Sequence, residues 1–208
     1  MNKEEVLELM KVIKPGSKVF VWGSGFVSKV IRSYSQWELD VEEKDTVFKR
    51  VRGFFKILLK KAIPDLPSHV EDYLGGGNHQ TISAEASGIK EMNLDRYIGK
   101  KYKIQVFSYN DMTVNQLQIV KAFLRGNLDK LYDLRGLVSF LGNIVKKKIS
   151  SWKFANFCSE LSAMASAEAG IQICSRGIKP EKQTPASQWN YIRKSKNWTL
   201  DFEYDNLK

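Results

Sequence analysis

The chain contains few of the residues that build disulfide frameworks, metal sites and cofactor sites. Only two of its 208 residues are cysteines and only two are histidines. Cys158 and Cys174 flank one short predicted helix, which favours reduced thiols over a disulfide framework. The sequence has no Walker loop, no dinucleotide-binding glycine fingerprint, no zinc-type His-Glu-x-x-His motif and no clustered Cys/His set. We therefore expect no cofactor and no metal.

Long apolar runs are also missing. No stretch approaches the roughly 20 apolar residues that a helix needs to span a bilayer. Residues 1–13 form an amphipathic pattern with acidic residues near its start, unlike the basic start and continuous apolar core of a signal peptide. We expect a cytoplasmic protein by default. A phage-borne or otherwise delivered protein would also need no export signal.

The composition predicts one domain. With 43% hydrophobic and 12% aromatic residues, the chain can bury a substantial core, and a single domain over residues 1–208 is the simplest organisation. The polar run 174–187, with Pro180 and Pro185, is expected to form a surface loop. Strands and helices mix along the chain, which indicates an α+β fold. Strands are expected at 18–22, 102–109 and 198–204, and helices at 27–34, 114–125 and 137–148.

A hairpin is predicted around one of the two histidines. Residues 68–74 and 80–86 alternate polar and apolar positions on either side of a glycine-rich turn. If the turn is centred on Gly77, Glu85 lies directly across from His69 and both side chains share one face of the sheet. Apolar positions take the other face, and Asp72 falls among them. His79, in the polar turn, is the weaker candidate for a catalytic base.

A helix with a cysteine at its start is predicted after residue 157. Small residues follow Cys158 on this helix and permit close packing, and Gly170 supplies a natural stop. A thiol at a helix N-terminus faces the positive end of the macrodipole, which favours the thiolate. Buried free cysteine more often acts as a small hydrophobe, so a nucleophilic role depends on a nearby base. Cys174 is expected to be structural or incidental.

Together these motifs resemble a known family. Ser68-His69-Val70 with Tyr73-Leu74-Gly75, then Ile82-Ser83-Ala84-Glu85-Ala86, and finally Phe157-Cys158-Ser159-Glu160-Leu161 are similar to the YiiX-like, circularly permuted branch of the NlpC-type papain-fold superfamily. In that branch histidine and glutamate precede cysteine in the sequence, as they do here. The resemblance covers most of the chain from about Pro15 onward.

The resemblance implies a fold, an activity and three site residues. The expected fold is a permuted papain-like domain, in which an antiparallel sheet or small barrel packs against helices. Cys158 would be the nucleophile, His69 the general base and Glu85 the residue that orients the base. The implied activity is that of a thiol peptidase or amidase acting on a peptide or a peptidoglycan fragment. Acyl chemistry on a lipid substrate is the alternative within the same superfamily.

The formal charge of +10 favours an anionic partner, and much of that charge is local. Residues 47–62 have the spacing of a basic amphipathic helix, within an apparent insertion at about 40–65. Its apolar face packs against the sheet in the ordinary interpretation. In the alternative interpretation the helix contacts an anionic membrane surface beside the site. The basic residues concerned are Lys49, Arg50, Arg52, Lys56, Lys60 and Lys61.

Two further function classes compete with an enzyme. A non-catalytic binding or structural module could keep the fold and use its basic surface, although an intact set of three polar residues is hard to explain by packing alone. Nucleic-acid binding would rest on charge only, because no recognition motif is present.

Overall fold

The computed structural model describes most of the chain in nine segments. These are residues 1–23, 26–40, 56–57, 65–76, 79–85, 87–130, 157–175, 179–180 and 183–207. The predicted helix at 137–148 and nearly all of the predicted basic helix at 47–62 therefore lie outside the described residues.

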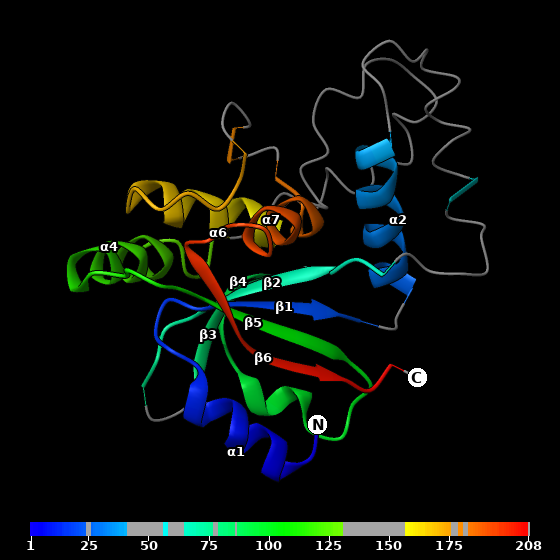
Figure 1. Cartoon of the computed structure of the whole chain (residues 1–208), viewed down its shortest axis with the longest axis horizontal. Helices are drawn as coiled ribbons and strands as arrows, with labels where there is room; N and C mark the ends of the chain where they lie inside the picture. Colours follow the sequence, from blue (N-terminus) through cyan, green and yellow to red (C-terminus); the bar gives the residue numbers. More distant parts are fainter. Residues whose placement is uncertain are drawn as a thin grey trace.

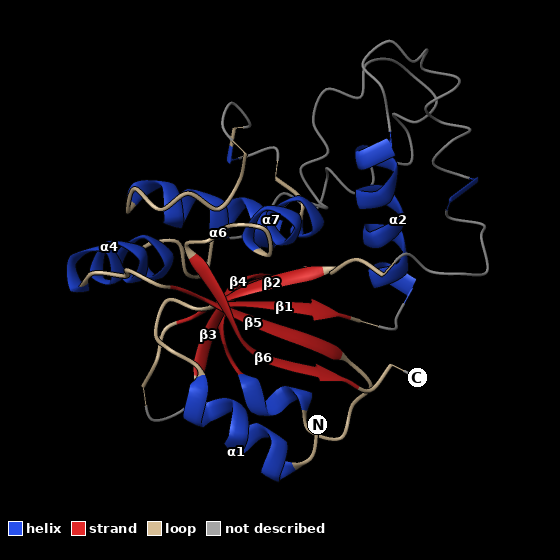
Figure 2. Cartoon of the chain, in the orientation of Figure 1, coloured by secondary structure: helices blue, strands red, loops and turns tan. Residues whose placement is uncertain are grey.

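A six-stranded antiparallel sheet forms the centre of the protein (Figures 1 and 2). The strand order is β4-β3-β2-β1-β5-β6, and β1 is buried along its whole length. The predicted α+β class is confirmed, and so are the predicted strands, but β4 was not anticipated. The strands are β1 (Lys18–Trp22), β2 (His69–Tyr73), β3 (Gln80–Glu85), β4 (Gly88–Asn93), β5 (Lys103–Tyr109) and β6 (Trp198–Asp205).

The β2–β3 hairpin has the predicted register. Asp72 lies opposite Ile82, and Tyr73 lies opposite Thr81. Because side chains alternate along a strand, the same register puts His69 and Glu85 on one face of the sheet. Gly75, the second residue of the connection between β2 and β3, has a positive φ of 76°. A Cβ there would lie 2.7 Å from Cγ of Pro15, so both conformation and space favour glycine.

Helices cover both faces of the sheet (Figure 1). α1 (Lys3–Val12) and the short 3₁₀ helix η1 (Leu94–Tyr97) lie on one face. α4 (Val114–Arg125), α6 (Phe157–Glu168) and α7 (Pro185–Ile192) lie on the other, and α2 (Phe26–Asp40) stands beside α7. The predicted helix at 114–125 is confirmed with the same limits. Thr113 caps it, since its side chain accepts a hydrogen bond from the Gln116 N–H.

The predicted surface loop 174–187 is wrong in its last part. α7 begins at Pro185, and the Thr184 side chain caps it by accepting a hydrogen bond from the Ser187 N–H at 3.1 Å. Proline suits the first helical position because its φ is already helical and its missing N–H would have no intrahelical partner. Of the two prolines in this run, Pro185 therefore starts a helix. α7 buries Gln188 and Trp189 against the core.

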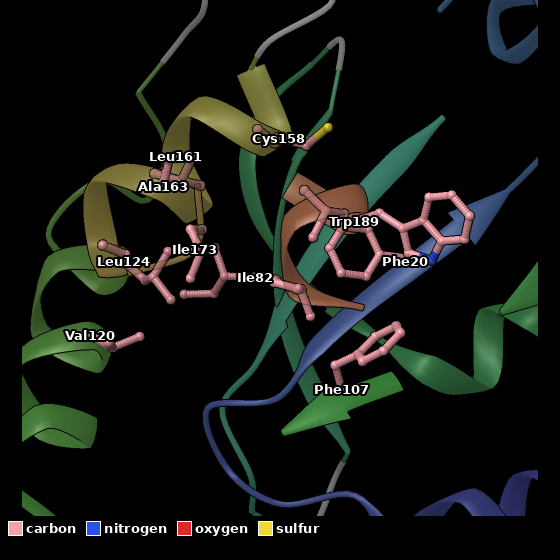
Figure 3. Packing of buried hydrophobic residues seen from close by; sticks show 14 of the residues in the cluster. Phe20, Ile82, Phe107, Val120, Leu124, Cys158, Leu161, Ala163, Ile173 and Trp189 are labelled. Atoms are coloured by element: carbon pink, nitrogen blue, oxygen red, sulfur yellow. The ribbon is translucent and has the colours of Figure 1, made fainter. Parts of the chain in front are cut away.

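Two apolar clusters fill the layers on either side of the sheet. The cluster beneath α4, α6 and α7 includes Phe20 and Phe107, whose rings meet edge to face with centroids 5.9 Å apart. Trp22 and Trp189 make a similar contact at 5.6 Å. Each fully buried side chain of this size contributes about 1.5–3 kcal/mol through its removal from water. Figure 3 shows Cys158 at one end of α6 within this cluster.

A buried ion pair explains why Asp72 lies on the apolar face. Lys18 is directly opposite Asp72 in the β1–β2 register, and its ammonium donates a hydrogen bond to the Asp72 carboxylate. Lys18 Nζ also lies 3.5 Å from the carbonyl oxygen of Ser162 on α6. Both charged side chains are 2% exposed. A buried charge is tolerated only when it is paired in this way, so the polar residue is compatible with the predicted register.

Candidate active site

Cys158 lies in the first turn of α6, where the helix packs against β2 and β3. The small buried residues Ala163 and Ala165 allow this close approach. Backbone N–H groups in the first turn of a helix have no intrahelical acceptor, and they point toward the positive end of the helix dipole. The thiol is therefore placed where a negative charge on sulfur, or on an oxygen bound beside it, is stabilised.

His69 is the first residue of β2, and a side-chain hydrogen bond joins it to Cys158. Its Nε2 atom lies 2.6 Å from Oγ of Ser83. Because Nε2 already has this partner, Nδ1 is the ring nitrogen available to the thiol. The imidazole thus lies between the thiol of α6 and a polar group of β3.

Glu85 lies near His69 but reaches it mainly through Ser83. The shortest separation between His69 Nε2 and Glu85 Oε1 is 3.6 Å, beyond a good hydrogen bond. Ser83, by contrast, donates a hydrogen bond of 2.9 Å to Glu85 Oε1. The three predicted site residues are brought together, and Ser83 bridges two of them. Sequence reasoning missed Ser83, although the alternation of β3 places it on the same face as Glu85.

A second carboxylate, from Glu71, lies on the same side of the imidazole. Glu71 Oε1 is 3.8 Å from His69 Nε2, and the side chain is completely buried. Thr81 donates a hydrogen bond of 2.6 Å to its other oxygen, and Tyr97 and Arg96 donate to Oε1. The sequence analysis assigned no role to Glu71. Its spacing of two residues from His69 is the signal that could have placed it on the same face.

The electrostatics of the site favour a charged imidazole. Burial disfavours the imidazolium, but the negative charge and hydrogen bond of Cys158, followed by the charges of Glu71 and Glu85, raise the pKa of His69 to about 9. Burial also opposes ionisation of Glu85, but His69 and Arg96 outweigh it and hold the pKa of that carboxyl below its ordinary value. The arrangement can therefore hold a thiolate beside an imidazolium, the state in which sulfur is a good nucleophile.

The other histidine and the other cysteine lie outside this arrangement. His79 belongs to the connection between β2 and β3, where its backbone N–H donates to the Gly76 carbonyl at 3.2 Å and its φ is 53°. Cys174 follows α6 and is half-buried, and burial raises the pKa of its thiol above the ordinary value. Raising the pKa of a thiol lowers its thiolate population at neutral pH. Cys174 is thus a weak nucleophile at neutral pH.

Other candidate features lie elsewhere or are missing from the described part of the chain. Within it, no group of three or more His, Cys, Asp or Glu side chains suits a metal ion, and no helix is long and apolar enough to cross a membrane. A cavity of about 200 Å³ lies between the segment before β1 and the start of α4, lined in part by Pro15, Tyr109 and Met112. It contains neither Cys158 nor His69. Of the basic residues expected to meet a membrane, only Lys56 lies among the described residues, and it is exposed.

Comparison with known proteins finds no family model and no curated relative that matches the chain.

Proposed function

We propose that the protein is a cysteine hydrolase that cleaves an amide bond through Cys158, His69 and Glu85. One observation carries the proposal: the Cys158 side chain, in the first turn of α6, is hydrogen-bonded to a histidine whose other ring nitrogen faces Ser83 and, through it, Glu85. A nucleophile, a base and a group that orients the base are the parts that nucleophilic acyl transfer requires. We also propose that the fold is the permuted papain-like fold implied by the sequence motifs.

The reaction proceeds in two acyl-transfer steps. The Cys158 thiolate attacks the carbonyl carbon of the scissile amide and forms a tetrahedral intermediate. The imidazolium of His69 then gives its proton to the departing amine as the C–N bond breaks, which leaves a thioester on Cys158. Water then attacks the thioester carbonyl while His69 takes up a proton from that water. The C–S bond breaks, which releases the carboxylic acid and restores the Cys158 thiolate.

The protein contributes charge stabilisation at each step. The backbone N–H of Cys158, in the first turn of α6, is placed to donate to the oxyanion of the tetrahedral intermediate. Ser83 and the two carboxylates on the far side of His69 stabilise the imidazolium and fix the plane of its ring. The side chains of Cys158, His69, Ser83 and Glu85 already lie together in the free protein, which supports attack without a large rearrangement of these groups.

The test is the rate of iodoacetamide alkylation at each cysteine, followed by peptide mass spectrometry across pH. Cys174 is the internal reference, because burial raises its pKa. We expect Cys158 to be alkylated rapidly below about pH 7, well under the reference thiol pKa of about 8.5, and to slow in His69→Ala. His79→Asn is the matched control: it removes the other histidine, and asparagine tolerates the positive φ of 53° at that position.

The outcomes distinguish an enzyme from a non-catalytic binding module. Fast labelling of Cys158 that depends on His69 and not on His79 supports the proposal and justifies a substrate screen among amides and acyl esters. Labelling of Cys158 with the pH dependence of an ordinary thiol, in parent and variant alike, would overturn it.

A further inference from the structure

Arg96 lies beneath the candidate site and contacts both of its carboxylates. The residue belongs to η1, which follows β4 and packs under the sheet with Leu94 and Tyr97 buried. Its Nη1 donates a hydrogen bond of 2.9 Å to Glu85 Oε1, and its Nη2 donates to Glu71 Oε1. One planar guanidinium thus joins two acidic side chains that come from neighbouring strands.

The position of Arg96 is itself well determined. Asn93 caps η1 by accepting a hydrogen bond of 2.9 Å from the Asp95 N–H. Nη2 of Arg96 also donates to the Tyr97 hydroxyl at 2.9 Å, and the guanidinium lies 5.0 Å from the centre of the Tyr97 ring. The Arg96 side chain is 20% exposed. A guanidinium in this setting stays protonated and offers donors in a fixed plane, which suits a two-point grip on carboxylates.

We propose that Arg96 is a positioning residue of this site: its guanidinium holds the side chains of Glu71 and Glu85 together beside the imidazole of His69. The inference rests on the proposed function, because it assigns a role in maintaining the thiolate–imidazolium pair. Two carboxylates so close together repel one another, and without a bridging cation one of them takes up a proton. A protonated carboxyl no longer stabilises the imidazolium.

Within the described segments of the chain, four elements supply the charged and titratable groups of this account. Cys158 approaches from α6, Glu71 from the histidine's own strand, and Glu85 from β3, while Arg96 and Tyr97 of η1 face the two carboxylates. Arg96 thereby contributes to the charge balance of the site without touching the imidazole or any reacting atom.

The test is a pH titration of His69 by NMR, read from its ring Cε1–Hε1 signal. The chain has only two histidines, so the spectrum holds two such signals, and a His79→Gln variant assigns them. In the parent protein we expect one inflection for His69, near pH 9. In Arg96→Gln we expect a second inflection on the acid side of the first, where the unclamped carboxylate pair binds a proton. Adding Glu85→Gln to this variant should remove that inflection, because a single carboxylate remains.

Alkylation provides the second readout. At pH 6 we expect Arg96→Gln to label Cys158 more slowly than the parent, because a protonated carboxyl no longer stabilises the imidazolium beside the thiolate. Arg96→Lys keeps the charge but, as a point charge, holds one carboxylate at a time, so the second inflection should appear with a smaller amplitude. Arg125→Gln is the matched control, because Arg125 forms an exposed 3.9 Å pair with Glu91 away from the site and its loss makes the same change in net charge.

The result that overturns the inference is a His69 titration curve in Arg96→Gln that superimposes on that of the parent. Where Arg96→Gln does not fold, a superimposable curve in Arg96→Lys has the same meaning. A purely structural role of Arg96 would lower the melting temperature and leave the shape of the curve unchanged. Failure of the proposed function differs from all of these, since Cys158 would then be unreactive in the parent protein itself.

Discussion

Replacement of Ser83 by alanine tests whether the polar side of the imidazole depends on one hydroxyl. Ser83 is 1% exposed and forms both short contacts of the bridge, at 2.6 Å to His69 Nε2 and 2.9 Å to Glu85 Oε1. In Ser83→Ala the nearest remaining acceptor for Nε2 is Glu85, at 3.6 Å. The imidazolium would lose a hydrogen bond that has no direct substitute at its present geometry.

The size of the effect follows from the strength of that bond. A hydrogen bond to a charged group contributes about 1.5–3 kcal/mol, and one pKa unit corresponds to about 1.4 kcal/mol. We therefore expect the pKa of His69, about 9 in the parent, to fall by roughly one to two units. Alkylation of Cys158 should also slow, because the imidazolium beside the thiolate is less well stabilised. Movement of Glu85 toward Nε2 would give the smaller fall in the pKa of His69.

The assay combines the histidine NMR titration with iodoacetamide labelling. Ser83→Thr keeps the hydroxyl and should retain most of the parent behaviour. Ser108→Ala is a matched control, because Ser108 is a buried serine of β5 whose hydroxyl has no hydrogen-bond partner in the described part of the chain. A Ser83→Ala protein with the parent's His69 titration and the parent's labelling rate would refute the bridge.

Three further predictions concern stability. Asp72→Ala leaves Lys18 as an unpaired buried charge and should lower the free energy of unfolding, measured in urea titrations, by about 3–5 kcal/mol. The double variant Lys18→Met/Asp72→Leu should recover most of that stability. A loss under about 1 kcal/mol in Asp72→Ala would contradict the pairing. Because the pKa of His69 rises from 6.5 to about 9 on folding, its stabilising contribution is complete below pH 6.5 and is lost as pH rises toward 9. The difference in unfolding free energy between parent and His69→Asn should shrink over that range, and a constant difference would contradict it. Leu124 is buried in the core cluster, and Leu124→Ala should lower the free energy of unfolding by about 2–5 kcal/mol. The alkylation rate of Cys158 in the folded variant should equal that of the parent. A slower rate would show that the site depends on this packing.

Local patterns in the sequence predicted the hairpin and the helix start because short-range rules determine both. Alternation along 68–74 and 80–86, with a glycine-rich turn, is enough to set the register that puts His69 and Glu85 on one face. The position of Cys158 in a first helical turn follows from the small residues after it and from Gly170.

Long-range partners could not be predicted in the same way. Lys18 and Asp72 are separated by 54 positions, so their pairing depends on the order of strands in the sheet. Arg96 reaches the carboxylates only because β4 pairs with β3 at the edge of the sheet and η1 then folds back beneath it, and neither element was anticipated. From the sequence alone, Pro185 is compatible with a loop or with the start of a helix. The Thr184 cap and the buried face of α7 show that it starts a helix.

The measurement that tests the central claim most directly is acyl-enzyme trapping at Cys158. The protein would be mixed with a p-nitrophenyl acyl ester at about pH 6, quenched in acid and examined by intact-protein and peptide mass spectrometry. The account predicts one added acyl group on Cys158, removable by hydroxylamine, greatly reduced in His69→Ala and retained in Cys174→Ser. A parent protein that acquires no acyl group at Cys158, or that is labelled equally at Cys174, would contradict it.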